Sequence, residues 1–128
     1  MKLVYFISPV GSDPQYLDKR KVLAETASEQ GVEFFFPLDR HTAFSVEAAM
    51  KDLRKSWIVI ADLSFERPSC YFEVGLAQGV GTPVSFIAAA NTLLHQAGGT
   101  SGILRYSSLQ TYRASVLELL AQHKRGDA

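Results

Sequence analysis

The sequence has little cysteine and no excess of charge. Cys70 is the one cysteine among 128 residues, which excludes an internal disulfide and any zinc site built on cysteine pairs. The 13 Lys and Arg residues balance 13 Asp and Glu residues. Proteins that bind nucleic acid polymers through counterion release need many basic contacts, so DNA and RNA are not expected as partners.

Long hydrophobic runs are also absent. The longest apolar stretches span five to eight residues, whereas crossing a bilayer takes about 20. The first residues lack the layout of a signal peptide. We therefore expect a soluble cytoplasmic protein without a membrane partner.

What the sequence does contain is an ordinary globular composition, with 47% hydrophobic and 20% charged residues. Its length fits one domain spanning residues 1–128. Short apolar runs alternate with segments of helical periodicity. The predicted strands are 3–7, 32–36, 57–61, 83–88 and 103–107, and the predicted helices are 16–30, 46–53, 68–80, 91–97 and 112–123.

This alternation predicts an α/β protein with a doubly wound, five-stranded parallel sheet, a three-layer sandwich of the flavodoxin or Rossmann kind. In such sheets, ligands bind beyond the carboxyl ends of the strands, where the strand order reverses. The loops at that edge are therefore the candidates for a site. They comprise residues 8–13, 37–41, 62–69 and 88–102.

The loop after the third strand leads to Glu73, in or just past the first turn of a helix that Ser69 could cap. The positive end of a helix stabilises a carboxylate, so Glu73 should be ionised at neutral pH. Such a carboxylate at a crevice can attack or stabilise an electron-poor carbon, as in glycosidases. Acidic residues early in a helix also commonly stabilise the helix alone, so both interpretations stand.

Asp62 directly follows the third strand, and we expect it to project into the same crevice. It could act as a base or bind a ribose hydroxyl, or it could be a simple loop cap. Arg67 and Ser69 could hold an anionic group beside the helix N-terminus. A solvated arginine and an ordinary cap are the alternative.

The turn after the first strand contains Ser8, Pro9 and Gly11 and could present backbone N–H groups to a phosphate or ribose. It is not a P-loop, because no Gly-Lys-Ser/Thr follows. The three histidines are far apart in sequence and form no i, i+4 pair, so neither a metal site nor a cofactor is expected.

Two segments resemble a known family. Tyr5-Phe-Ile-Ser8-Pro9 is similar to the Tyr-x-x-Gly-Pro opening of nucleoside 2-deoxyribosyltransferases. Residues 71–84, with sequence YFEVGLAQGVGTPV, resemble that family's aromatic-Glu-hydrophobic-Gly-x-Ala segment and its Gly-x-Pro-Val link to the next strand. The resemblance covers residues 2–87.

The resemblance implies a five-stranded parallel sheet and a glutamate that attacks C1′ of a nucleoside. By position this nucleophile is Glu73, and Tyr5 orients it. Asp62 resembles the acidic residue that follows strand three in some members. The same superfamily includes 2′-deoxynucleoside 5′-phosphate N-hydrolases, in which water accepts the sugar.

The sequence departs from the transferase pattern at one place. Transferases carry Asp-Ser-Gly-Thr before the aromatic-Glu pair, whereas this chain has Arg67-Pro68-Ser69-Cys70. An arginine cannot act as a general acid at neutral pH, so hydrolysis is favoured over base exchange. The Ser-Cys-Tyr-Phe-Glu run also resembles Toll/interleukin-receptor-type domains, whose enzymatic members cleave the nicotinamide N-glycosidic bond of NAD.

The leading hypothesis is therefore cleavage of an N-glycosidic bond in a small nucleoside or nucleotide, by hydrolysis or deoxyribosyl transfer. The alternatives are a nucleotide-binding sensor with a degenerate site and an NAD-cleaving domain. We also expect a homodimer or larger homo-oligomer whose neighbour closes each site. Leu93, Leu94 and part of the last helix are the candidates for that contact.

Overall fold

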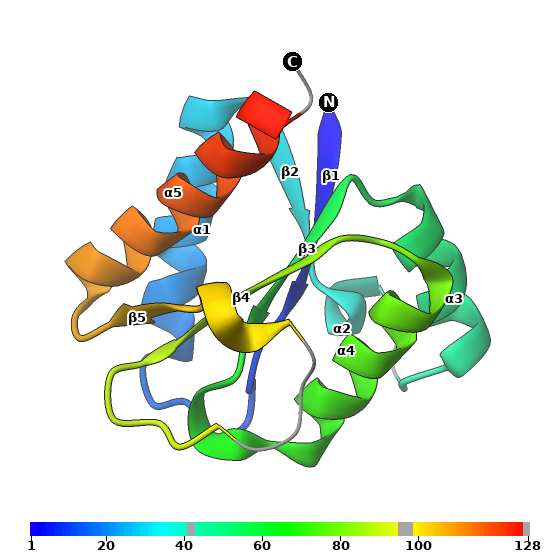
Figure 1. Ribbon diagram of the computed structural model, residues 1–128, viewed down its shortest axis with the longest axis horizontal. Coiled ribbons are helices and arrows are strands. Elements are labelled where there is room, and N and C mark those ends of the chain that lie inside the picture. Colours follow the sequence, from blue (N-terminus) through cyan, green and yellow to red (C-terminus); the bar gives the residue numbers. More distant parts are fainter. Residues whose placement is uncertain (41–42, 95–98, 127–128) are drawn as a thin grey trace.

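The computed structural model describes residues 1–40, 43–94 and 99–126. Its five strands form one parallel sheet in the order β2-β1-β3-β4-β5 (Figure 1). This is the flavodoxin-like order, in which the switch point lies between β1 and β3. The strands are β1 (Lys2–Ile7), β2 (Val32–Phe35), β3 (Ile58–Asp62), β4 (Val84–Ala89) and β5 (Leu104–Tyr106).

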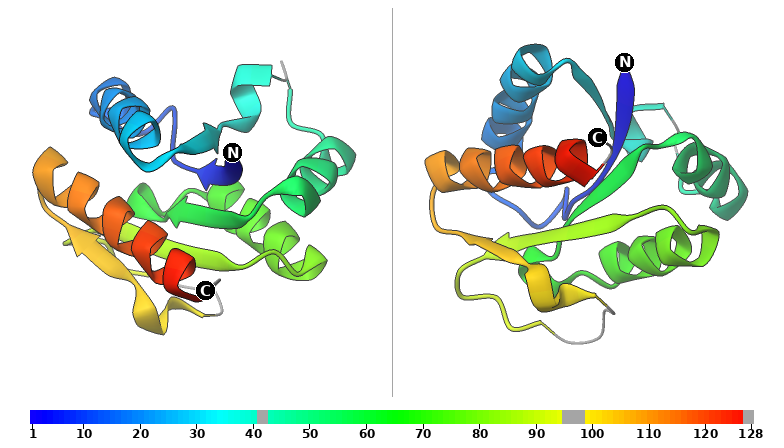
Figure 2. Two further views of the ribbon diagram at one scale, coloured as in Figure 1. Left: turned by 90° about the horizontal axis from the view of Figure 1, so that it is seen from above. Right: turned by 45° about the horizontal axis from the view of Figure 1, so that its top comes forward.

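Helices cover both faces of the sheet, so the predicted three-layer α/β class is confirmed (Figure 2). One face is covered by α1 (Tyr16–Gln30) and α5 (Leu109–Gly126), and the other by α3 (Val46–Lys55) and α4 (Pro68–Val80). Within the described residues, no helix is both long enough and apolar enough to span a bilayer.

Each strand divides its residues between two cores, because successive side chains point to opposite faces. In β3, Ile58 and Ile60 pack in the core beneath α1 and α5. Val59 and Ala61 pack in the core beneath α3 and α4. All four are at most 1% exposed, which explains why this strand reads as an uninterrupted apolar run.

The helix boundaries follow local signals in the sequence. Helix α1 begins and ends at the predicted residues, and Gly31 closes it in the left-handed conformation with φ of 65°. The Ser45 side chain accepts a hydrogen bond from the Ala48 N–H and caps α3 as expected.

Three local predictions were wrong. Residues 91–94 of the predicted 91–97 helix form a turn and irregular backbone, and the remainder lies outside the described residues. Ser69 does not cap α4, because Pro68 is its first residue and Arg67 occupies the cap position without a side-chain hydrogen bond. A short helix, α2 (Pro37–Arg40), was not predicted.

The connection from β3 to α4 contains a 3₁₀ turn, η1 (Ser64–Glu66). Phe65 and Glu66 have φ angles of 65° and 50° within it. Side chains other than glycine rarely adopt this left-handed region, and two in succession mark a turn held by its surroundings.

Candidate functional site

A cavity of about 380 Å³ lies at the carboxyl edge of the sheet, within the size range of small-molecule sites. Its walls come from the β1–α1 loop, the segment after β2 and the start of α4, next to the switch point of the sheet. The described lining residues are Phe6, Ser8, Pro9, Val10, Gly11, Ser12, Tyr16, Phe36, Pro37, Leu38, Phe44, Arg67, Ser69, Phe72 and Glu73.

The cavity wall carries a carboxylate that is held by a buried phenol. The Tyr5 hydroxyl donates a hydrogen bond to Glu73 Oε2 over 2.9 Å. Tyr5 itself is fully buried, whereas Glu73 is partly exposed and lines the cavity. The structure therefore brings together the two residues that the resemblance paired.

The sheet and α4 bring this pair together. Tyr5 in β1 is the register partner of Val59 in β3, and both pack in the core beneath α4. Helix α4 rests on that core through Val74 and Ala77. Glu73 precedes Val74 in sequence, so its side chain reaches the end of the Tyr5 ring at the margin of the core.

Burial, rather than the helix end, controls the charge of Glu73. The residue is five positions beyond Pro68, the first residue of α4, so it lies past the first turn where the helix dipole acts. Burial raises the pKa of Glu73, and the hydrogen bond from Tyr5 opposes this rise. Burial and the neighbouring carboxylate also raise the pKa of Tyr5, so its hydroxyl keeps the proton that it donates.

The residues expected to bind substrate meet around Glu73. Ser8, Pro9 and Gly11 line the cavity from the β1–α1 loop, and Arg67 and Ser69 line it from the start of α4. Two chain segments separated by more than fifty residues thus contribute to one wall, as the topology of the sheet predicts.

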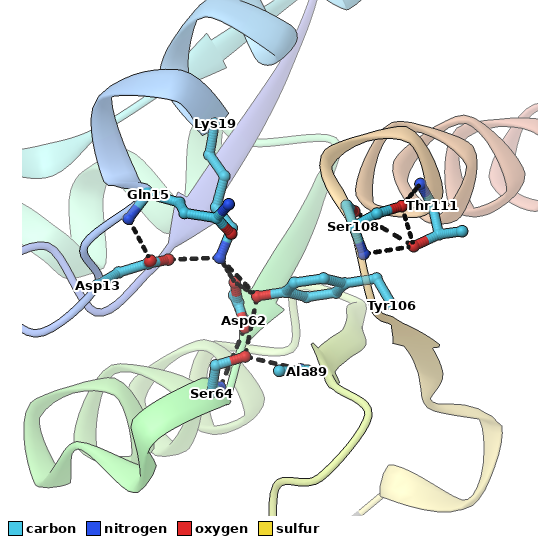
Figure 3. Close-up of polar contacts among 9 residues, drawn as sticks. All are labelled: Asp13, Gln15, Lys19, Asp62, Ser64, Ala89, Tyr106, Ser108 and Thr111. Carbon is cyan, nitrogen blue, oxygen red and sulfur yellow. Dashed lines mark hydrogen bonds and ion pairs between the residues drawn. The ribbon is translucent and has the colours of Figure 1, made fainter.

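Asp62 does not lie where we expected it. It is fully buried and does not line the cavity. As the last residue of β3 it shares a face with Ile58 and Ile60, so it points toward α1 and α5, away from Glu73. There Asp62 Oδ2 accepts a hydrogen bond from the Tyr106 hydroxyl over 2.7 Å (Figure 3).

Five aromatic side chains line the cavity, Phe6, Tyr16, Phe36, Phe44 and Phe72, and none was predicted as a site residue. The rings of Phe44 and Phe72 meet edge to face at 5.8 Å and are 42% and 52% exposed. Tyr16 and Phe36 lie deeper, and Arg20 stands 3.6 Å over the Phe36 ring while donating to the Tyr16 hydroxyl. The aromatic lining suits a flat, unsaturated ring of a ligand.

Other candidate chemistry is limited. Burial raises the pKa of the Cys70 thiol to about 12, so the group stays protonated at neutral pH and packs in the core. Across residues 1–40, 43–94 and 99–126, no group of three His, Cys, Asp or Glu side chains is arranged to hold a metal ion.

No protein-family model matches the sequence, and no curated protein is significantly similar to it. Solved structures do match. The 2-deoxyribosyltransferase of Leishmania mexicana superimposes with a TM-score of 0.66 at 18% identity, over 96% of this chain and 99% of that one. The CMP N-glycosidase of Clostridium botulinum gives a TM-score of 0.64 at 17% identity, over 90% and 98%.

A third match is the TIR domain of a Toll-related receptor from Hydra magnipapillata. It has a TM-score of 0.66 at 12% identity and covers 95% of this chain and 97% of that one. The chain therefore has a nucleoside 2-deoxyribosyltransferase-like fold that TIR domains share at a distance. At these identities the comparisons show the fold, and the activity has to be argued from the site.

Proposed function

We propose that this protein cleaves the N-glycosidic bond of a nucleoside or nucleotide, with Glu73 as the nucleophile. The observation that carries the proposal is the Tyr5–Glu73 hydrogen bond of 2.9 Å in the wall of an aromatic cavity. The fold supports it, since two similar structures are a 2-deoxyribosyltransferase and a CMP N-glycosidase.

In this mechanism Tyr5 fixes the carboxylate and Glu73 attacks. Tyr5 holds Oε2, which leaves Oε1 for the anomeric carbon. As the Oε1–C1′ bond forms, the C1′–N bond breaks and its electron pair leaves with the base. Water then adds to C1′, releases the sugar and returns the Glu73 carboxylate. Partial burial of the carboxylate strengthens its interaction with the positive charge that develops at C1′.

The departing base also needs a proton. Among the described residues that line the cavity, Glu73 is the one carboxylic acid, and Arg67 remains charged and cannot supply a proton. We infer that water protonates the base. A site open to water in this way favours hydrolysis over transfer to a second base.

The other lining residues suggest how the two ends of a nucleotide would lie. The base would contact the exposed rings of Phe44 and Phe72. A 5′-phosphate would lie against Arg67 and Ser69, with Ser8 and Gly11 completing the wall on the opposite loop. The proposed substrate is therefore a small nucleotide or nucleoside.

The direct test is to incubate the protein with a panel of ribo- and deoxyribonucleosides, their 5′-monophosphates and NAD, and to measure free base by chromatography. We expect one class of compound to release its base, and the Glu73→Gln variant to release none above background. Base release that is equal in the variant would contradict the proposal.

A binding module is the second candidate. It is favoured by the absence, among the described lining residues, of a second carboxylic acid to activate the base. Saturable binding of one panel member without release of base from any would select this function.

We further propose that a second copy of the chain covers the cavity mouth. Leu38, Phe44 and Phe72 are more than 40% exposed there, and burying these apolar side chains against a partner surface is favourable. In α5, Tyr112, Val116, Leu119 and Leu120 are buried in the core beneath the helix and so are not available for this contact. Light scattering should give a multiple of 14.1 kDa; a fully active monomer would contradict the proposal.

A further inference from the structure

A buried polar network lies on the opposite face of the sheet from Glu73. It consists of Asp13, Lys19, Asp62, Ser64 and Tyr106, all at most 8% exposed (Figure 3). These residues come from the β1–α1 loop, α1, β3, η1 and β5. Burying one lysine and two aspartates is unfavourable unless each group is paired, so the network needs an explanation beyond packing.

The Tyr106 hydroxyl is the centre of this network. It accepts a hydrogen bond from Lys19 Nζ over 2.8 Å, donates to Asp62 Oδ2 over 2.7 Å and contacts Ser64 Oγ over 2.9 Å. A phenol hydroxyl has one proton and two lone pairs. With the proton given to Asp62, the Ser64 hydroxyl acts as donor, and all three positions of the Tyr106 oxygen are used.

On one side the network ends in the loop that carries Ser8 and Gly11. Lys19 forms a buried ion pair with Asp13 Oδ2, and Asp13 Oδ1 accepts the Gln15 N–H over 2.9 Å. The Asp13 N–H in turn donates to the Pro9 carbonyl over 3.1 Å. Asp13 therefore joins the cavity loop to α1 and, through Lys19, to Tyr106.

On the other side the network ends in the loop that leads to Arg67 and Ser69. Asp62 Oδ1 accepts the Ser64 N–H over 3.0 Å, which fixes the first turn of this loop. Ser64 Oγ also accepts the Ala89 N–H over 2.7 Å and so ties the loop to the end of β4. The two segments that line the cavity are thus joined, on the opposite face of the sheet, through the Tyr106 hydroxyl and through the Lys19–Asp62 ion pair of 4.0 Å.

We propose that Tyr106 and Lys19 are positioning residues that hold the two cavity loops, residues 8–13 and 62–69, in a fixed relation to each other. Asp62 belongs to this device, so its contribution to activity is indirect. Neither Tyr106 nor Lys19 touches the cavity. The coupling between the two loops does not depend on a bound ligand. Its effect on turnover rests on the proposed function.

The first experiment therefore uses no ligand. Tyr106→Phe removes the central hydroxyl and keeps the ring. The matched control is Tyr112→Phe, because Tyr112 is also a buried tyrosine, and its ring packs edge to face on that of Tyr106 at 5.0 Å. In Tyr106→Phe we expect amide hydrogen exchange to accelerate about tenfold in both loops, at Ser12 and Asp13 in one and at Ser64 and Glu66 in the other, and not in β1 or β3.

The control should leave both loops unchanged. Faster exchange in one loop only, or the same pattern in Tyr112→Phe, would overturn the proposal. Should Tyr106→Phe fail to fold, Ser64→Ala replaces it, since this variant removes another hydroxyl of the same network, from the loop at residues 62–69, and keeps the Tyr106 hydroxyl. We then expect faster exchange at Ser12 and Asp13, in the other loop, and unchanged exchange there would overturn the coupling.

The second experiment uses whichever compound of the panel is cleaved. Tyr106→Phe should raise KM about tenfold while kcat stays within about threefold, because the loops bind the ligand and Glu73 is untouched. A fall in kcat at constant KM would overturn the positioning role. If the wild type cleaves no compound, the proposed function fails, and the exchange experiment still decides the coupling of the loops.

Discussion

Glu73 and Asp62 are two carboxylates near the same edge of the sheet, on opposite faces of it. Glu73 is partly exposed, opens on a cavity and accepts one hydrogen bond, from Tyr5. Asp62 is fully buried, and both of its oxygens accept hydrogen bonds, from Ser64 and Tyr106. Burial raises the pKa of both carboxyl groups. The difference is that Glu73 lines a cavity of the size of a small-molecule site, whereas Asp62 does not line it.

This difference comes from the alternation of side chains along a strand. The side chains of Tyr5 and its register partner Val59 point toward α4. Asp62 comes three positions after Val59 in the same strand, so its side chain points to the opposite face of the sheet. An acidic residue at the end of a buried strand, Asp62, can therefore be structural, while the proposed nucleophile, Glu73, comes from the helix that follows. Variants of the two sites separate these roles.

The largest effect is expected for Glu73→Gln. This change keeps the shape of the side chain and removes the charge, so turnover should fall at least about a thousandfold while ligand affinity survives. Steady-state kinetics and calorimetry measure the two quantities. Glu118→Gln, at an exposed position on α5, is the control. More than a tenth of the wild-type rate in Glu73→Gln would reject the nucleophile.

Asp62→Ala should act mainly on stability. It leaves the buried hydroxyl of Tyr106 and the Ser64 N–H without their acceptor, a loss of about 2–3 kcal/mol in the free energy of unfolding. Urea denaturation measures it. Asp18→Ala, an exposed aspartate in the first turn of α1, should lose less than about 1 kcal/mol. Equal losses in the two variants would mean that the buried network contributes no more to the free energy of unfolding than an exposed carboxylate does.

Tyr5→Phe tests the link between the phenol and the carboxylate. Removing a hydrogen bond to a charged group should lower kcat about tenfold or more. The reaction needs ionised Glu73, so activity falls as the pH drops through its pKa, and the bond from Tyr5 holds that pKa down. The acidic limb of the pH profile should therefore move to higher pH in Tyr5→Phe and stay in place in Tyr112→Phe. An unmoved limb would separate Tyr5 from the chemistry.

Arg67→Met should affect only phosphorylated ligands. The guanidinium pairs with a phosphate in a charge-assisted contact, so KM for a nucleoside 5′-monophosphate should rise about tenfold and KM for the nucleoside should not change. Arg54→Met, at an exposed position on α3, should alter neither. Equal loss for both ligands would remove the phosphate assignment.

Gly79→Ala should have the smallest effect and the opposite sign. Nothing lies within 4 Å of a Cβ added at this exposed position of α4, so the helix should gain about 0.5–1 kcal/mol with unchanged turnover. Gly81→Ala, where φ is 85°, should destabilise the protein in the same thermal melt. A drop in turnover for Gly79→Ala would show that Glu73 needs a more mobile helix.

Periodicity and caps were sufficient for the sheet and for the bounds of α1 and α4. The Tyr5–Glu73 pair, 68 residues apart, was expected only from the resemblance to nucleoside 2-deoxyribosyltransferases. The direction of the Asp62 side chain depends on whether this residue belongs to β3. The predicted strand stopped at Ala61, whereas the structure extends it through Asp62, so a residue expected in a loop follows the alternation of the strand and lies inside the protein.

Lys19 and the cavity aromatics were missed for different reasons. Lys19 is a charged residue buried on α1, paired with Asp13 and with Tyr106, 87 residues away. A pattern over neighbouring residues of the sequence does not predict a partner so far along the chain. Phe44 and Phe72 come from a loop and from the outer side of a helix, where apolar periodicity gives no signal.

The left-handed turn at Phe65 and Glu66 has a consequence for how this protein can change over evolutionary time. The turn connects Asp62 and Ser64, which hold it, to Arg67, which faces the ligand cavity. A substitution that removes the hydrogen bonds holding this turn lets Phe65 and Glu66 relax toward ordinary backbone angles, and Arg67 moves with them. Residues 62–67 are therefore expected to tolerate coordinated replacements better than single ones, and to be inherited as a unit.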